Sequence, residues 1–218
     1  MKETDLFEPV KNLLLTSDME LYTEVSCGYG RADIVAVKDN LATIVELKTS
    51  LSLQLIEQVY ERRIMAHYTY AAVPLPKNRY FNGFAVSLLM KAGIGLIGID
   101  CNWGEASIHT RAKLNRNAGI RQLNYLHEGQ RYENNIPGGS VGGGYWTPYS
   151  EMIKQVRRLI ERKHPKPVSM AEIIEHVEIV SRHYVQPKSS LFSALTKIEK
   201  EWCESVKIDG RTHFRLRP

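Results

Sequence analysis

Two carboxylates and a lysine near the start of the chain have the types and the spacing needed to hold a divalent cation beside a nucleophile. Asp33 lies in residues 31–38 (RADIVAVK), and Glu46 and Lys48 lie in residues 41–49 (LATIVELKT). Both segments read as strands, and side chains two residues apart on a strand point to the same face. A turn at residues 39–40 would pair position 33 with position 46. The pattern therefore predicts two adjacent carboxylates with an ammonium group on the same side.

Adjacent carboxylates raise each other's pKa unless a cation lies between them. Ligand sets made only of oxygen favour Mg²⁺ or Mn²⁺ over zinc. Such an ion lowers the pKa of a coordinated water and offsets the charge of a phosphate. Lys48 could then orient the attacking water or stabilise the developing oxyanion. A cross-strand salt bridge at the surface is the alternative that these three residues alone leave open.

The surrounding pattern predicts an α/β fold with a mixed central sheet flanked by helices. Apolar residues recur at helical spacing in residues 3–17, where Thr4 could cap the start. Three strands with short turns then indicate an antiparallel meander. The expected elements are helix 3–17, strands 21–27, 31–38 and 41–49, a helix that Ser50 could cap, strand 68–73, helix 84–91, and strands 94–99 and 106–112.

The order of these residues and elements resembles the PD-(D/E)xK nuclease superfamily, which includes restriction endonucleases and archaeal-type Holliday junction resolvases. The similarity covers about residues 3–112, and Ala32 stands where the motif's name has proline. It implies a restriction endonuclease-like core and a Mg²⁺-dependent DNA endonuclease, with Mn²⁺ as a substitute. The implied catalytic residues are Asp33, Glu46 and Lys48, and the implied metal ligands are Glu8, Asp33, Glu46 and the Leu47 carbonyl.

Several polar residues near this motif have two readings each. Glu8 could equally be a helix acid favoured by the dipole, and Glu3 is the alternative ligand from the same segment. Glu24 belongs either beside the site or in solvent. Arg31 either contacts a DNA phosphate or closes the glycine turn before it. Gln54 and Gln58 resemble a glutamine that follows this motif in some branches of the superfamily, but we interpret them as an ordinary polar helix face.

A glycine-rich stretch divides the chain. Residues 127–146 contain Pro137-Gly138-Gly139 and a run of three glycines, which is typical of a flexible linker or a mobile functional loop. No Gly-Lys-Ser/Thr sequence follows, which argues against a phosphate-binding loop. We expect a nuclease-like domain at residues 1–126, a linker or mobile loop at 127–148 and a second domain at 149–218.

The second domain has the pattern of a winged helix-turn-helix. Helices are expected at residues 149–163, 169–177 and 189–202, and Asp209-Gly210 predicts a hairpin within residues 206–216. Residues 125–218 carry 15 Lys and Arg against 11 Asp and Glu. Basic side chains on such a domain would contact DNA, or would form a solvated or protein-binding face. The candidate DNA-binding residues are Arg31, Lys188, Ser189, Lys197, Arg211, His213 and Arg215.

Composition sets the remaining expectations. The chain has 218 residues, 43% of them hydrophobic and 24% charged, which excludes global disorder. No apolar run is long enough to span a membrane, and the first ten residues lack a signal-peptide core. Three cysteines far apart in sequence predict a reducing cytoplasm. We expect DNA as the partner, and one site per chain is compatible with a homodimer. The alternative is a non-catalytic DNA-binding or assembly protein on a repurposed nuclease fold.

Overall fold

The computed structural model describes residues 1–27, 30–118, 126–140, 144–177 and 186–217, and the chain divides into two compact units. The first unit is Met1–Trp146 and the second is Thr147–Pro218. The division falls at the end of the glycine-rich stretch. The described part of that stretch before residue 147 belongs to the first unit, where it includes a 3₁₀ turn, η3 (Glu128–Gln130).

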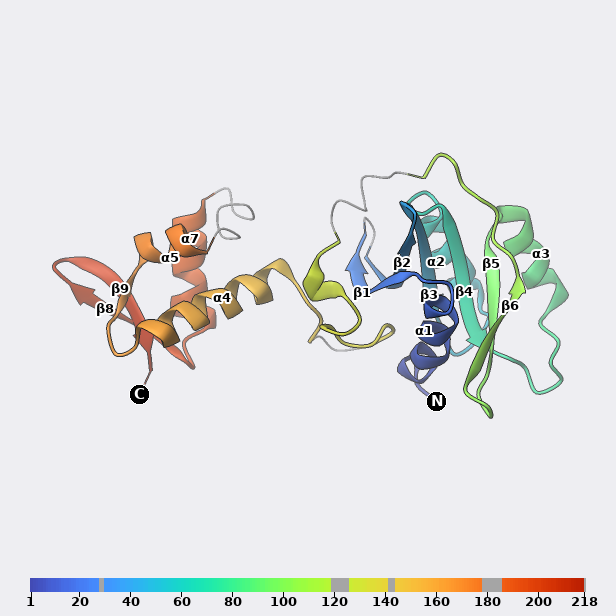
Figure 1. The fold of residues 1–218 in the computed structure, drawn as a ribbon, viewed down its shortest axis with the longest axis horizontal. Helices are drawn as coiled ribbons and strands as arrows, with labels where there is room; N and C mark the ends of the chain where they lie inside the picture. The colour runs from blue at the N-terminus through green and yellow to red at the C-terminus, as the bar shows by residue number, and fades with distance from the viewer. Residues whose placement is uncertain (28–29, 119–125, 141–143, 178–185, 218) are drawn as a thin grey trace. The chain divides into compact units, whose positions relative to one another are not determined.

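The first unit is built on a six-stranded mixed sheet in the order β1-β2-β3-β4-β5-β6 (Figure 1). The pairs β1–β2, β2–β3 and β5–β6 are antiparallel, and β3–β4 and β4–β5 are parallel. The expected meander of the first three strands and the mixed α/β arrangement are confirmed. The strands are β1 (Glu20–Ser26), β2 (Arg31–Lys38), β3 (Leu41–Leu47), β4 (Tyr68–Pro74), β5 (Gly95–Asp100) and β6 (Glu105–Thr110).

Helices cover both faces of this sheet, and alternate residues of each strand supply the two cores. Val45 and Leu47 pack with α1 (Phe7–Leu15) on one face. Ala71 and Val73 pack with α2 (Leu53–Arg62) and α3 (Gly83–Ala92) on the other face. The chain enters α1 through a 3₁₀ turn, η1 (Glu3–Leu6).

Local capping explains where the two helices of the second face begin. The Ser52 side chain accepts a hydrogen bond from the Leu55 N–H, so α2 is capped two residues later than the predicted Ser50. Asn82 caps α3 in the same way. Gly93 ends α3 in the left-handed conformation, with φ of 74°, as its glycine predicts.

The second unit combines helices with a three-stranded sheet in the order β7-β9-β8. Ser169 and Glu172 form the predicted capping box. The predicted helix 189–202 is shorter: regular helix ends at Ser193, a π-helical turn follows, and the chain then turns into a strand. The described elements are α4 (Pro148–Lys163), β7 (Val168–Ser169), α5 (Met170–His176), α7 (Pro187–Ser193), the π-helical turn η4 (Ala194–Ile198), β8 (Cys203–Ile208) and β9 (Arg211–Leu216).

The C-terminal hairpin forms at the predicted Asp209-Gly210 turn. Both turn residues have positive φ, 49° and 74°, as a tight hairpin turn requires. Phe214 on β9 is fully buried in the core of this unit. All three cysteines are free. Among the described residues, no helix has the length and apolarity to cross a membrane.

Candidate active site

Asp33 and Glu46 face each other across the antiparallel pair of β2 and β3. Ile34 pairs with Val45, so the next positions outward are Asp33 and Glu46, which is the predicted register. The Leu47 N–H donates a hydrogen bond of 2.7 Å to Asp33 Oδ2. The residue between Glu46 and Lys48 therefore holds the neighbouring carboxylate in place.

Glu46 is fully buried, and both of its oxygens are hydrogen-bonded by side chains of α2. Gln58 Nε2 donates to Oε2 at 2.6 Å, and Arg62 Nε donates to Oε1 at 2.8 Å. Gln58, interpreted from sequence as part of a polar helix face, thus belongs to the site. A carboxylate oxygen has two lone pairs, so each can accept one of these bonds and still bind a cation.

Arg62 is a site residue that the sequence analysis missed. Its side chain is buried and also donates to the Arg31 carbonyl at 2.9 Å. Leu55, Val59 and Arg62 follow the i, i+4, i+7 spacing of the buried face of α2. A buried arginine needs an anionic or carbonyl partner. Its position on that face was the feature that could have revealed it.

Burial raises the pKa of both carboxyl groups, and the Asp33 carboxylate adds to the shift of Glu46. Burial first, and then the Asp33 carboxylate, raise the pKa of Glu46 to about 8, although Arg62 opposes the shift. Burial raises the pKa of Asp33 as well, against the Leu47 N–H and the Lys48 ammonium. The half-buried Asp33 and the fully buried Glu46, both with a raised pKa, are a donor set whose ionised form a divalent cation would stabilise.

Lys48 completes this edge of the sheet through an ion pair with Glu3. Its Nζ lies 2.7 and 2.9 Å from the two carboxylate oxygens of Glu3, which is part of η1. Glu8, predicted as the metal ligand, lies elsewhere: its side chain is 64% exposed and pairs with Lys11 at 2.5 Å. Glu3, the alternative acid from the same segment, lies in the 3₁₀ turn and is the one that contacts Lys48, whereas a ligand role for Glu8 stays a prediction.

Glu24 lies beside Asp33 on β1, where Thr23 pairs with Ile34. It is a buried non-glycine residue with φ of 52°, an uncommon conformation that costs energy. Its carboxylate accepts the Ser140 N–H at 3.1 Å. Burial first, and then Asp33, raise its pKa. Of its two readings, the structure places Glu24 beside the site.

Arg31 is engaged within the first unit. Its Nε lies 3.1 Å from Glu24 Oε2, and its guanidinium stacks 3.6 Å from the centre of the Tyr145 ring. These contacts hold the cation beside the carboxylate row. Its predicted DNA contact stays a prediction, and residues 28–29 of the turn before it lie outside the described residues.

A strap formed by residues 135–140 lies across the same acids. Thr23 Oγ1 donates to the Ile136 carbonyl at 2.8 Å, and a Cβ added to Gly138 would lie 2.5 Å from the Asp33 carbonyl oxygen. Gly139 has φ of 77° and packs against Glu3. Only glycine allows the backbone to approach this closely. Residues 135–140 of the predicted loop therefore cover the candidate site.

The donor atoms suit Mg²⁺ or Mn²⁺ in kind, because they are all oxygens. In number they fall short: within the described ranges, no group of three His, Cys, Asp or Glu is arranged to hold a metal ion. Asp33 and Glu46 supply two carboxylates. The Leu47 carbonyl as a third ligand stays a prediction.

The remaining candidate DNA-binding residues lie in the second unit. Ser189 Oγ donates to the Gln186 carbonyl at 3.2 Å, near the start of α7. On β9, Arg215 pairs with Glu204 at 2.5 Å, and His213 Nδ1 lies 3.2 Å from the Arg211 carbonyl. The exposed members of this set are Lys188, Ser189, Lys197, Arg211 and Arg215.

No protein-family model matches the chain, and no curated protein matches its sequence. Two solved structures are similar to part of it. An XisH family protein from Nostoc punctiforme is 18% identical with a TM-score of 0.37, over 50% of this chain and 99% of its own. SfsA of Pyrococcus furiosus, solved with Ca²⁺, is 14% identical with a TM-score of 0.29, over 49% of this chain and 60% of its own. We therefore base the functional proposal on the geometry of this chain alone.

Proposed function

We propose that the first unit is a metal-dependent nuclease that hydrolyses phosphodiester bonds of DNA. The observation that carries the proposal is the juxtaposition of Asp33 and Glu46 in register, joined through the Leu47 N–H. Lys48 follows two residues after Glu46, as the resemblance to PD-(D/E)xK nucleases requires. Burial and raised pKa values at both carboxyl groups are features that cluster at catalytic sites.

Asp33, Glu46 and the Leu47 carbonyl would hold Mg²⁺, or Mn²⁺ in its place. When bound, a divalent ion supplies charge neutralisation for the scissile phosphate and lowers the pKa of water. The Lys48 ammonium would orient the attacking water and stabilise the developing oxyanion. Glu3 would aim that ammonium, because both of its oxygens lie within 3 Å of Lys48 Nζ.

Gln58 and Arg62 act on Glu46 rather than on the substrate. Their two hydrogen bonds fix the plane of the carboxylate toward Asp33. Arg62 also favours the ionised form, which is the form that binds a cation. They are positioning residues. Their replacement is expected to weaken metal binding more than it destabilises the sheet.

For the second unit we propose a winged helix-turn-helix that binds DNA. Its element order is helix, strand, two helices and a two-stranded hairpin, and the hairpin pairs with the first strand. Exposed cations lie on α7, on η4 and on β9.

Arg211→Ala should weaken duplex binding on all sequences and reduce the log–log salt slope by about 0.9. Arg215→Ala should have a smaller effect, because Glu204 already offsets its charge. If both variants keep the salt slope of the wild type, the proposed DNA-binding role of the hairpin is contradicted.

One observation favours a second candidate, a non-catalytic DNA-binding or assembly protein. Both oxygens of Glu46 are already bonded, and the described residues offer no three-ligand group. Calorimetric titration with Mg²⁺ and Mn²⁺ separates the candidates. A nuclease binds the ion and loses that binding in Asp33→Ala, whereas a protein without a catalytic site shows no binding that depends on Asp33.

The substrate is tested by incubating the full chain with duplex, single-stranded, flapped and four-way DNA, in Mg²⁺, in Mn²⁺ and in EDTA. The proposal predicts cleavage of at least one substrate that depends on the metal. Absence of cleavage on all four substrates in both metals would contradict it.

A further inference from the structure

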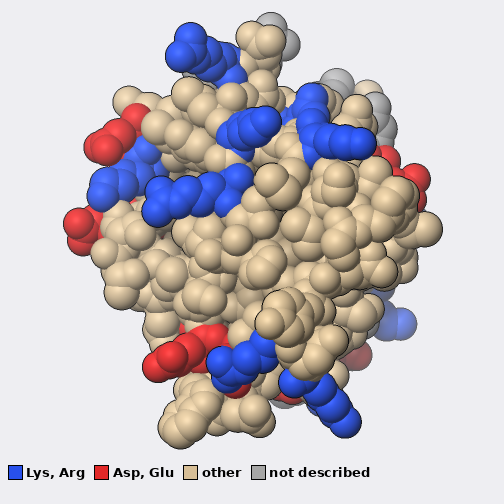
Figure 2. Space-filling model, turned by 90° about the vertical axis from the view of Figure 1, so that its right-hand side faces the viewer, with Lys and Arg blue, Asp and Glu red and all other residues tan. Residues whose placement is uncertain are grey.

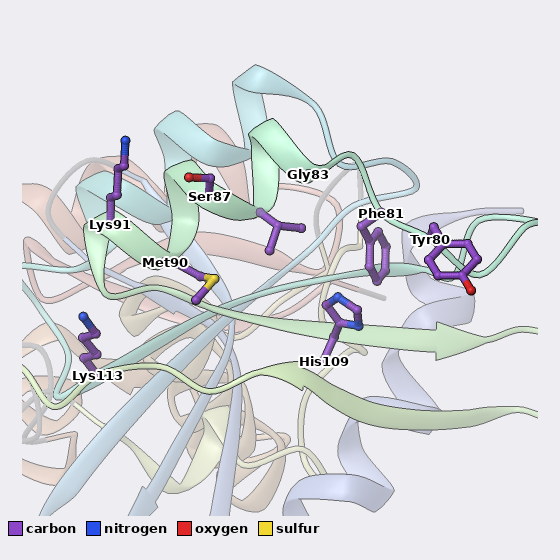
Figure 3. Close-up of a pocket in the computed structure, with 9 residues that line it drawn as sticks. Tyr80, Phe81, Gly83, Ser87, Met90, Lys91, His109 and Lys113 are labelled. Carbon is purple, nitrogen blue, oxygen red and sulfur yellow. The ribbon is translucent and has the colours of Figure 1, made fainter.

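A pocket of about 520 Å³ lies between α3 and β6 in the first unit (Figure 3). Aromatic side chains gather at one end, and two lysines lie at the other. Ser87 and Met90 of α3 line the wall between the two ends. The pocket uses none of the residues assigned to the candidate active site.

The aromatic end consists of Tyr80, Phe81 and His109. Tyr80 is 79% exposed. Phe81 and His109 meet edge to face, with ring centres 4.9 Å apart. That contact fixes the two rings, and Tyr80 offers an open face beside them.

The opposite end carries Lys91 and Lys113. Lys113 follows β6, and its backbone N–H donates to the Gly93 carbonyl at 2.9 Å, which ties its segment to the end of α3. Neither ammonium forms an ion pair within the described residues, and no Asp or Glu lines the pocket. This end is therefore suited to an anion.

Figure 2 shows the side of the molecule toward which α3 and β6 lie. Its middle is largely uncharged, Lys and Arg gather along its upper part and again in its lower part, and Asp and Glu lie among them at the margins. The uncharged middle of this face can meet planar apolar groups, and the two lysines of the pocket can meet negative charge.

We propose that this pocket binds single-stranded DNA, with a base against Tyr80 and Phe81 and backbone phosphates at the two lysines. Stacking platforms combined with a cationic groove are the chemistry by which proteins hold single strands. In a duplex the faces of the bases are stacked on one another and cannot reach the rings. A duplex therefore meets only the lysines.

The segment that carries Tyr80 leaves a strand that is paired with the strand of the candidate active site. Tyr80 belongs to the connection that leaves the end of β4, and Ala72 of β4 pairs with Leu47 at the end of β3. The inference rests on the proposed nuclease function in one respect, since it names the substrate class: DNA with a single-stranded segment beside the point of cleavage.

The test is fluorescence anisotropy of a labelled homothymidine oligonucleotide of about 12 nucleotides, with the full chain in EDTA. Tyr80→Ala should weaken binding about fivefold or more, with an unchanged salt slope. Lys91→Ala combined with Lys113→Ala should reduce the log–log salt slope by about 0.7 for each lost phosphate contact. Affinity for a duplex of the same length should fall less than affinity for the single strand in Tyr80→Ala, because only the single strand can place a base against this ring.

Tyr60→Ala and Lys77→Ala are the matched controls, because both side chains are exposed and neither lines this pocket. Pocket variants that bind the single strand as well as these controls do would overturn the proposal. Equal losses on duplex and single strand in Tyr80→Ala would overturn it too, as would thymidine monophosphate binding as tightly as the oligonucleotide. Strand binding without metal-dependent cleavage would contradict the nuclease function while leaving the pocket assignment in place.

Discussion

The backbone N–H of Leu47 donates a 2.7 Å hydrogen bond to Oδ2 of Asp33. This bond joins the two strands of the candidate site at the residue between Glu46 and Lys48. Because the donor is a backbone N–H, its position is determined by the register of β3 and not by a side-chain rotamer. The bond therefore restricts the rotamer of Asp33 and aims its carboxylate.

Removal of the Asp33 side chain should therefore cost stability. Asp33→Ala leaves the Leu47 N–H without its acceptor, and an unsatisfied buried donor costs about 1–3 kcal/mol. Asp33→Asn keeps an acceptor oxygen and should lose less. Urea unfolding without metal measures both variants. A destabilisation that is the same for Ala and Asn would contradict the structural role of this bond.

Glu46 should make the stability of the protein depend on pH. Its folded-state pKa is raised to about 8, so the folded protein binds more protons than the unfolded chain between about pH 4.5 and 8. Stability contributed by Glu46 is therefore lost as the pH rises through that window, by at most a few kcal/mol.

Glu46→Gln cannot bind this proton and should show a flatter profile. Unfolding measured in EDTA from about pH 5 to about pH 8.5 compares the two proteins. Glu8→Gln serves as the control and should follow the wild type, because its exposed carboxylate lies away from the site. Parallel profiles for wild type and Glu46→Gln would show that Glu46 is ionised throughout.

Glu3 and Glu8 should differ sharply in their effect on cleavage. Glu3→Gln removes the carboxylate that holds Lys48, and mispositioning of a catalytic group commonly costs about 10²-fold in rate. Glu8→Gln should leave the rate within about twofold, since only the surface pair with Lys11 is lost. Rates of metal-dependent DNA cleavage measure both, and the reverse ranking would restore Glu8 to the site.

The strap over the acids should tolerate no side chain at residue 138. A Cβ there would lie 2.5 Å from the Asp33 carbonyl oxygen, so Gly138→Ala should destabilise the protein by about 1–3 kcal/mol. Gly83→Ala is the matched control. Nothing lies within 4 Å of its added Cβ, and the change should be neutral or slightly stabilising. Thermal unfolding of both variants tests this, and an unaffected Gly138→Ala would show that the strap does not pack on Asp33.

Local sequence was sufficient for the first three strands and for their antiparallel pairing. Alternating residues and a two-residue turn at Asp39-Asn40 determine which side chains of β2 and β3 are opposite each other, so the register of Asp33 and Glu46 was predictable. The capping box at Ser169 and the turn at Asp209-Gly210 are equally local, and both form as predicted.

Residues that join the site through tertiary contacts were not predictable in this way. Arg62 meets Glu46 across 16 residues of sequence, and the Ser140 N–H meets Glu24 across 116. Composition predicts that the strap is a loop, but packing decides what it covers. The helical pattern of residues 3–17 likewise does not show that the chain begins with a 3₁₀ turn, which brings Glu3 to Lys48.

The most direct test of the central claim is nicking of supercoiled plasmid DNA in Mg²⁺ by wild type and by Glu46→Gln. Glutamine keeps the size of the side chain but cannot supply the negative charge that a divalent ion needs. The account predicts cleavage by the wild type that stops in EDTA, and a rate at least about 10²-fold lower in Glu46→Gln. Cleavage by Glu46→Gln at the wild-type rate, or no cleavage by the wild type in Mg²⁺ or Mn²⁺, would contradict it.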